Sequence, residues 1–535
     1  MKSKPLSFVG VLLAATGILV ATDALAEWPS AGADLSNSRY QSQQSDISSQ
    51  TVSQLQLKWT FTTAGDVTAH PTVDGDYIYF PDSAGFLYKV QKASGALVWK
   101  RQISGYTGIA GDLARGTPAV AGNLLILGDL SGRNVQAFGA LPPQPARVFA
   151  VDKDTGNLVW VTQVDDTQLS FVTNSPIVYK KTAFVGVASN EELVSAFVPP
   201  ANWQWQFRGS VVALNVNTGA IKWKTYTVPP GYYGGSVWGS TGAVDAKSNL
   251  LFMTTGNNYA VPQSVLNCLG APSPAADCVS PDDHFDSLIA LDLDTGAIKW
   301  GQKSMPSDIW NVACGLLTIP GFPIPNPFTP GAYGNCPNGN PGTAGPDYDF
   351  AQGPMLLEDG LVGAGQKSGM FWAFNRDTGA PAWSVQAAPG GITGGLQWGS
   401  ATDGVHIFVA VSNSGTSHGG GGAQWKLKDG TTIASGGWAA LSRKAGEVLW
   451  TTPDPIGSRS EAPVSATNDV VFGCNLAPGV GRMVAMNANT GAILWSYDSG
   501  GPCNAGASIS DGMVFWGNGT FAGTGVKKVF AFGLP

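Results

Sequence analysis

Seven copies of one eleven-residue pattern recur along the chain, and every copy ends in tryptophan. Each copy has an alternating apolar half, a turn of the Asn/Asp-Thr-Gly type, and a second half that closes on the tryptophan. Alternation predicts β-strands, and the turn glycine supplies the positive φ that a tight hairpin needs. We therefore expect one hairpin from each copy, at residues 89–99, 150–160, 213–223, 290–300, 373–383, 440–450 and 485–495.

An eighth copy is divided between the two ends of the chain. The sequence ends in "VFAFGLP", which repeats the opening of the pattern, while "LQLKWTF" near the start supplies the ending with Trp59. The N-terminal strand is therefore expected to complete the last sheet, because a closed ring protects strand edges. The repeats predict an all-β protein, an eight-bladed β-propeller with Trp-docking repeats. Independent hairpins with core tryptophans are the alternative, which seven matched copies disfavour.

Composition agrees with a fold rich in strands and turns. Of the 535 residues, 70 are glycine and 18 are tryptophan, and only 13% are charged. The formal net charge is −7, and no basic run occurs. Nucleic acid and anionic membrane surfaces are therefore poor partners for this chain.

The first 26 residues are typical of a secretory signal peptide. Lys2 and Lys4 precede an apolar run, and Ala24-Leu25-Ala26 forms a small-residue cleavage site. A membrane anchor is the alternative, which the short run and the lack of stop-transfer charges disfavour. We expect cleavage after Ala26, a periplasmic location without stable membrane insertion, and a single propeller domain over residues 27–535.

Six cysteines and four histidines are present, and export would permit disulfides. Pairing of nearest neighbours is the simplest of fifteen connectivities, because each pair brackets one long loop. It predicts Cys268–Cys278, Cys314–Cys336 and Cys474–Cys503. No CxxCH motif offers a covalent haem site. The histidines have no zinc-ligand spacing, and each is expected in a loop or at the surface: His70, His284, His406 and His418.

The segments between the repeats resemble those of the quinoprotein alcohol dehydrogenases. "WPSAGADLSNSRYQ", "GSVWGSTGAVD", "SDIWNVAC" and "GPDYDFAQGPML" are most similar to polyvinyl-alcohol dehydrogenases of that family. The resemblance covers nearly all of the chain after residue 26. It implies a dehydrogenase that uses pyrroloquinoline quinone (PQQ) and calcium to oxidise secondary or polymeric alcohols. Because this chain has no haem site, a separate cytochrome c or another periplasmic acceptor would receive the electrons.

The resemblance also implies a base and a metal site. Asp308 in "SMPSDIWNVAC" matches the family's general base, which also contacts the metal. Asn257 in "MTTGNNY" and Glu191 in "VGVASNEELV" match calcium ligands, with Glu192 as the alternative to Glu191. PQQ atoms would complete the oxygen shell that calcium prefers. Lanthanide-dependent members carry an acid where this chain has Trp310, so calcium is favoured.

Further positions match residues that bind the cofactor. Trp238 matches the tryptophan beneath the planar quinone, and the second "QWGS" segment leaves Trp398 as a weaker alternative. Arg115 and Lys367 match cations that contact PQQ carboxylate or quinone oxygens. Thr173 matches a hydroxyl that binds the cofactor.

Two departures from the family pattern concern the roof of the cofactor site. "GIAGDLARG" lacks the adjacent cysteines that many members carry before the arginine, and Thr68 stands where a glutamate is common. The rival class is a non-catalytic propeller scaffold of the outer-membrane assembly type. Such scaffolds carry a lipidated cysteine directly after the signal, whereas Glu27 follows Ala26 here. Long loops that contain acidic residues favour the enzyme.

Overall fold

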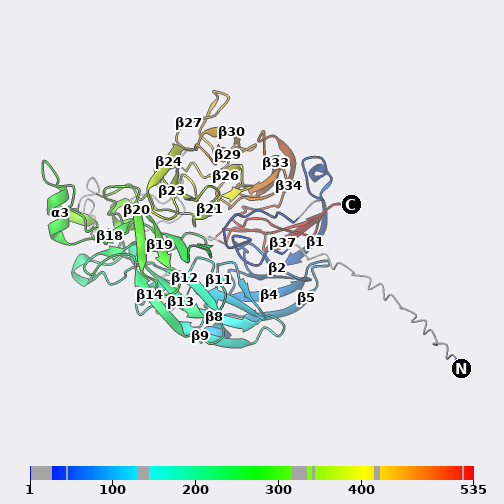
Figure 1. Cartoon of the computed structure of the whole chain (residues 1–535), viewed down its shortest axis with the longest axis horizontal. Helices are drawn as coiled ribbons and strands as arrows, with labels where there is room; N and C mark the ends of the chain where they lie inside the picture. Colours follow the sequence, from blue (N-terminus) through cyan, green and yellow to red (C-terminus); the bar gives the residue numbers. More distant parts are fainter. Residues whose placement is uncertain are drawn as a thin grey trace.

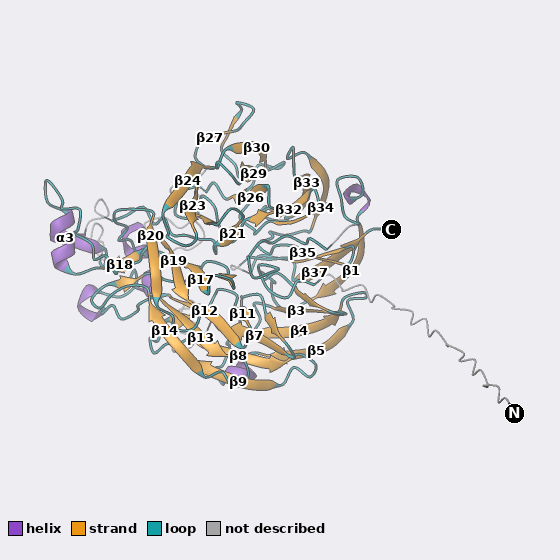
Figure 2. Ribbon diagram, in the orientation of Figure 1, coloured by secondary structure: helices purple, strands orange, loops and turns teal. Residues whose placement is uncertain are grey.

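The computed structural model describes residue 1 and residues 27–43, 46–130, 144–315, 334–339, 344–414, 422–520 and 523–535. Within these ranges, eight antiparallel sheets stand side by side around one axis (Figures 1 and 2). The proposed signal peptide, apart from residue 1, and His418 lie outside the described residues. The expected all-β, eight-bladed β-propeller is confirmed.

Each blade takes four main strands in chain order from the axis outward. The first four blades are β2 (Thr72–Asp74), β3 (Tyr77–Pro81), β4 (Phe86–Gln91) and β5 (Leu97–Gln102); β6 (Ala119–Ala121), β7 (Leu124–Gly128), β8 (Arg147–Asp152) and β9 (Leu158–Gln163); β11 (Ile177–Tyr179), β12 (Thr182–Ser189), β13 (Ser210–Asn215) and β14 (Ile221–Tyr226), with β10 (Ser170–Phe171) beside β12; and β16 (Ala243–Asp245), β17 (Leu250–Thr254), β19 (Ser287–Asp292) and β20 (Ile298–Lys303).

The other four blades follow the same order. They are β21 (Met355–Leu357), β22 (Leu361–Gly365), β23 (Met370–Asn375) and β24 (Pro381–Gln386); β25 (Ala401–Thr402), β26 (His406–Val411), β29 (Gly437–Ser442) and β30 (Val448–Pro453); β31 (Ser465–Thr467), β32 (Val470–Cys474), β33 (Arg482–Asn487) and β34 (Ile493–Asp498); and β35 (Ser508–Ser510), β36 (Met513–Gly517) and β37 (Lys528–Gly533), completed by β1 (Gln56–Thr62). Each repeat copy forms the third and fourth strands of its blade, as expected.

Shorter elements lie in the connections. The two-stranded pairs are β15 (Tyr233–Gly234) with β18 (Asn258–Ala260), and β27 (Trp425–Lys426) with β28 (Thr432–Ile433). The helices are α1 (Ser104–Thr107), α2 (Glu191–Val194), α3 (Gln263–Leu269) and α4 (Val312–Gly315), with 3-10 turns η1 (Val52–Gln54), η3 (Pro200–Asn202) and η4 (Pro337–Gly339). α3 projects at the edge of the molecule (Figure 1). No helix in the described ranges combines the length and apolar composition needed to span a bilayer.

The N- and C-terminal strands close the ring. β1 pairs antiparallel with β37, from Gln56 opposite Gly533 to Thr62 opposite Lys528. β37 in turn pairs with β36, so the first strand of the chain is the outermost strand of the last blade. The expected closure is therefore confirmed.

The closing tryptophan of each repeat docks on the following blade. The Trp160 indole N–H donates to the carbonyl of Val216 at 2.7 Å, and that of Trp450 donates to the carbonyl of Ala488 at 2.8 Å. Trp59, Trp99, Trp223, Trp300 and Trp495 make the same kind of bond, at 2.9 to 3.3 Å. Trp383 packs on the next blade, but its N–H has no partner in the described part of the chain.

The repeat glycine is the second half of this interface. Gly219 has φ +71°, and a Cβ atom built on it would lie 2.5 Å from a ring carbon of Trp160. The same contact joins Gly95, Gly156, Gly296, Gly379, Gly446 and Gly491 to the tryptophan of the preceding blade. Glycine is therefore required at this position both for the left-handed backbone and for the room that the indole occupies.

An N-terminal segment, residues 28–41, crosses the first strands near the axis; we call it the axial strap. Backbone bonds join the strap in order to residues of five blades: Val73, Val120, Val244, Leu356 and Thr402. Gln41 continues the series, because it bonds to Ala466 through its backbone N–H and to the carbonyl of Ile509 through its side chain. One short segment thus holds seven of the eight innermost strands.

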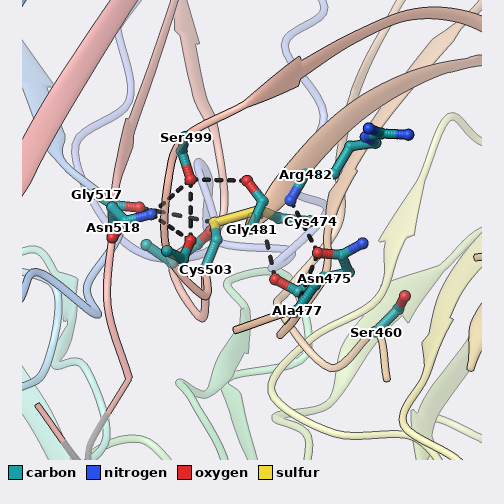
Figure 3. The surroundings of a disulfide bond; sticks show 12 residues. Ser460, Cys474, Asn475, Ala477, Gly481, Arg482, Ser499, Cys503, Gly517 and Asn518 are labelled. Atoms are coloured by element: carbon teal, nitrogen blue, oxygen red, sulfur yellow. Dashed lines mark hydrogen bonds between the residues drawn. A yellow bond between two sulfur atoms is a disulfide. The ribbon is translucent and has the colours of Figure 1, made fainter. Parts of the chain in front are cut away.

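The three predicted disulfides are all present, at Cys268–Cys278, Cys314–Cys336 and Cys474–Cys503. The third is buried and joins the end of β32 to the connection between the last two blades (Figure 3). Two asparagine side chains bind the backbone near this disulfide. The Asn475 side-chain oxygen accepts from the Arg482 backbone N–H, and the Asn518 amide donates to the carbonyl of Gly501 at 2.6 Å.

A glycine substitution tests the docking interface. Gly219→Ala should lower the free energy of unfolding by about 2–5 kcal/mol, because the left-handed backbone and the overpacked indole both oppose the methyl group. Gly122→Ala is the matched control: its φ is +63°, but no atom lies within 4 Å of the new Cβ. It should cost only about 1–2 kcal/mol. Equal urea midpoints for the two variants would contradict the interface described here.

Candidate active site

A small pocket lies where the connections into the first strands converge. It is lined by residues that directly precede β2, β6, β11, β16, β25, β31 and β35, and thus by seven blades. Its volume is about 40 Å³, which is room for a small group of atoms. Arg115 and Thr173, two of the predicted cofactor residues, line it together with Trp398.

Several polar atoms around this pocket are buried without a partner. Within the described ranges, these are Thr173 Oγ1, His70 Nε2, Trp398 Nε1, Asn504 Oδ1 and both polar side-chain atoms of Asn174. Buried polar groups normally have hydrogen-bond partners, so several unpaired polar atoms around one pocket fit a polar ligand. His70 lies in the loop before β2, as expected, but it is buried and lines the pocket.

Two tryptophans and two cations extend from the pocket in one row. The Arg115 guanidinium carbon lies 3.9 Å from the centre of the Trp398 ring, and the Trp398 and Trp238 rings are 5.3 Å apart at 70°. Lys367 Nζ lies 5.4 Å from the centre of the Trp238 ring. Trp398 has φ +60°, a left-handed conformation that is unusual for a bulky residue and is concentrated at functional sites.

Asp349 connects this row to the predicted metal site. It accepts hydrogen bonds from the Trp238 indole at 3.1 Å and from the Asn257 backbone N–H at 2.6 Å. Lys367 Nζ is paired with Asp349 at 2.7 Å and with Asp347 at 2.8 Å. Burial alone would lower the pKa of Lys367, but the two carboxylates outweigh it and raise that pKa. The lysine is therefore a fixed cation.

Asp308 is fully buried beside these residues. Its Oδ2 accepts from the Tyr348 backbone N–H at 2.7 Å, and its backbone carbonyl accepts from Asn258 N–H at 3.0 Å. Burial raises the pKa of Asp308 to about 6, although the Tyr348 N–H opposes the shift. Burial, followed by the charge of Asp308, raises the pKa of Asp286 far above its usual range. Asp286 thus belongs to the same acidic cluster.

The two candidate glutamates at the start of α2 have different surroundings. The carboxylate of Glu191 accepts from the backbone N–H groups of Gln206 and Phe207 at 3.0–3.2 Å. Burial raises the pKa of Glu192 to about 8, and the charges of Asp349 and Asp308 add to the shift. The carboxylate of Glu191 is thus held by backbone amides, whereas the charge of Glu192 is coupled to those of Asp349 and Asp308.

The structure thus gathers Asp308, Asn257, Lys367 and Trp238 around Asp349, and Arg115 and Thr173 at the adjoining pocket. Sequence reasoning missed Asp286, Asp347 and Asp349. The segment "GPDYDF" contains Asp347 and Asp349 on either side of an aromatic residue, but no role was predicted for these two acids.

The side-chain oxygens at this site could bind a cation, but they do not form a complete metal site. Among the described residues, no three His, Cys, Asp or Glu side chains are gathered closely enough to hold a metal ion. Lys367 nonetheless pairs with Asp347 and Asp349, and the charges of Glu192, Asp286 and Asp308 act on the same cluster of acids. Carboxylate oxygens are the ligands that calcium prefers. Asn257 donates its amide N–H to the carbonyl of Trp310 at 2.6 Å, which leaves its amide oxygen for a cation.

The chain is thus an eight-bladed propeller with a polar pocket near its axis. The chain belongs to the PQQ_2 family, described as outer membrane protein assembly factor BamB, whose sequence model matches residues 45–302 and 434–527. It is 26% identical to a polyvinylalcohol dehydrogenase of Pseudomonas sp. over 94% of this chain and 74% of that protein, and 26% identical to one of Sphingopyxis sp. strain 113P3 over 91% and 72%. Quinohemoprotein alcohol dehydrogenase ADHIIG of Pseudomonas putida HK5 shares the fold, with a TM-score of 0.66 and 18% identity over 95% of this chain and 80% of that structure.

Replacement of the buried lysine should be costly. Lys367→Met leaves two buried carboxylates without their cation and should lower the free energy of unfolding by about 3–5 kcal/mol. Lys428→Met removes an exposed pairing with Glu447 and should change it by less than about 1 kcal/mol. Denaturant titrations of both variants check this, and a Lys367 variant as stable as the parent would refute the buried ion-pair network.

Proposed function

We propose that the protein is a PQQ- and calcium-dependent alcohol dehydrogenase that acts in the periplasm on secondary or polymeric alcohols. The observation that carries the proposal is the row from Arg115 through the paired tryptophans to Lys367, which ends at the buried acidic cluster. A flat anionic cofactor requires cations, planar faces and hydroxyl donors, and these are the groups present. The two relatives named polyvinylalcohol dehydrogenase support the substrate class.

The chain's residues would divide the binding of PQQ among them. Arg115 and Thr173 would hold a carboxylate in the axial pocket, because guanidinium and hydroxyl groups are good carboxylate partners. Trp238 and Trp398 would bound the cofactor with aromatic faces, and Lys367 would face its oxygen atoms. When bound, PQQ supplies the hydride acceptor.

Asp308 is the proposed general base. Its carboxylate would accept the proton of the substrate hydroxyl, and the Tyr348 N–H would hold Oδ2 in a fixed orientation. Calcium would be held by Asp308, by the amide oxygen of Asn257 and by Glu192. We prefer Glu192 to Glu191 as the third donor, because backbone amides already bind the carboxylate of Glu191. The electrons would leave to a separate cytochrome c or another periplasmic acceptor.

A non-catalytic scaffold is the second candidate, because the matching family is described as an outer membrane assembly factor. A scaffold requires the blades and their rim, but it does not require five acids and an aromatic pair near the axis. The site therefore favours the enzyme.

Reconstitution decides between the two candidates. Purified protein incubated with PQQ and calcium should bind the quinone, as measured by its absorbance after gel filtration, and should then reduce a dye when a secondary alcohol is added. Protein that retains no quinone at saturating calcium would rule out the dehydrogenase and leave the scaffold.

Substitution of the base should abolish turnover without unfolding the chain. Asp308→Asn is nearly isosteric, and loss of a positioned base typically costs about 10²- to 10⁴-fold in rate. Dye-coupled assays at saturating PQQ and calcium measure the loss, and circular dichroism checks the fold. Turnover near the parent rate would remove Asp308 from the mechanism.

The two glutamates provide a matched pair of variants. Glu192→Gln should raise the calcium concentration for half-maximal activity by about tenfold or more, because a charged ligand is lost. Glu191→Gln should leave this concentration within about twofold and lower the melting temperature instead, because it weakens hydrogen bonds to a charged acceptor. The opposite result would restore Glu191 as the calcium ligand.

A further inference from the structure

Arg39 of the axial strap is a buried cation that contacts no carboxylate of the described residues. Its side chain is 0% exposed, and its backbone is left-handed at φ +47°. No ion pair to it occurs among the described residues. Burial lowers the pKa of Arg39 to about 10, and the longer-range charge of Asp34 opposes the shift only in part. Such a charge costs folding free energy, so its presence calls for an explanation.

The guanidinium binds neutral acceptors from three parts of the chain. Nη1 donates to the side chain of Asn37 at 2.8 Å and to the carbonyl of Ser400 at 3.5 Å. Nη2 donates to Ser240 Oγ at 3.0 Å and to the carbonyl of Trp398 at 3.4 Å. Within the described ranges, Nε has no partner. Ser240 Oγ also donates to the Trp398 carbonyl, so one arginine fixes both residues.

These contacts place Arg39 against the wall of the axial pocket. Ser240 and Trp398 line the pocket, and Trp398 carries the Arg115 guanidinium on its face. The Ser240 carbonyl accepts from Ser175 N–H at 2.6 Å, and Ser175 Oγ accepts from Thr117 N–H at 2.8 Å. The hydrogen-bond network thus continues to pocket residues that precede the first strands of the second and third blades.

The positive charge of Arg39 also reaches the pocket. Burial lowers the pKa of His70, another lining residue, and the charge of Arg39 lowers it further. Arg115 supplies the pocket with a second cation. An anion at this end of the site would therefore compensate the charge of Arg39, which pairs with no carboxylate in the described part of the chain.

We propose that Arg39 is a positioning residue for the carboxylate-bearing end of the cofactor. It holds Ser240 and the left-handed Trp398 in place and sets a buried positive charge behind the pocket. The proposal rests on the proposed function, because it concerns how that site takes an anionic cofactor. The strap therefore acts on ligand affinity as well as on the assembly of the blades.

The test compares PQQ affinity in strap variants of the full chain. Arg39→Met keeps the side-chain length but removes the charge and all four hydrogen bonds. PQQ binding to protein prepared without cofactor is followed by quenching of tryptophan fluorescence, at saturating calcium and well below the melting temperature. We expect the dissociation constant to rise by about tenfold or more, because the buried charge behind the pocket and the support of Ser240 and Trp398 are both lost. Its dependence on salt should also become shallower.

Gln41→Met is the matched control. Gln41 is a buried residue of the same strap, and it bonds to the carbonyl of Ile509 without lining the pocket. This variant should lower the melting temperature and leave the dissociation constant within about twofold, because it removes neutral hydrogen bonds, to Glu27, Gln43 and Ile509, at residues that do not line the pocket. A purely structural role of Arg39 predicts the same behaviour for both variants.

The outcomes distinguish a protein that does not bind PQQ from one in which Arg39 has no role in binding it. Parent protein that binds no PQQ refutes the proposed cofactor, whereas parent binding with unchanged affinity in Arg39→Met refutes the role of Arg39 alone. If Arg39→Met does not fold, Arg39→Lys decides. It keeps the charge but cannot make the forked contacts, so affinity about threefold weaker supports the proposal and unchanged affinity overturns it.

Discussion

The contact between an indole and the turn of the next blade is the interaction on which this molecule depends. The Trp160 N–H satisfies the carbonyl of Val216 while its ring covers Gly219, and equivalent contacts recur around the ring. Because each contact joins two blades, the circle of interfaces sets where every first strand stands. The axial pocket is lined by residues from several blades, so its shape depends on how these interfaces position the blades.

The axial strap complements the indole contacts from the centre. The tryptophans fix the outer strands, while the strap bonds to one first strand after another and sets Arg39 among them. Residues far apart in sequence, such as Arg115 and Trp398, then meet because their connections enter the same narrow space. The positions of the candidate site residues therefore depend on the contacts that hold the blades together.

The sequence predicted most of the fold but only part of the site. The repeats, the split blade and the three disulfides were readable because each depends on residue spacing, and spacing is what a sequence records. Arg115 and Thr173 were predicted because "DLARGTP" and "VTNSP" resemble segments of the family, and both residues line the axial pocket. The choice between Glu191 and Glu192 was not readable, because it depends on which way two neighbouring side chains turn at a one-turn helix. Asp347 and Asp349 were missed because their importance comes from Lys367 and Trp238, which other segments supply.

The pairing of β1 with β37 has a consequence for how the chain reaches its native state. The partners lie near opposite ends of the sequence, and contacts of such long range form slowly. Until they meet, β37 presents an open edge of unpaired backbone groups, which is the kind of edge that recruits strands from other chains. A chain in which β1 and β37 have not yet paired therefore carries a self-association hazard that the closed ring does not.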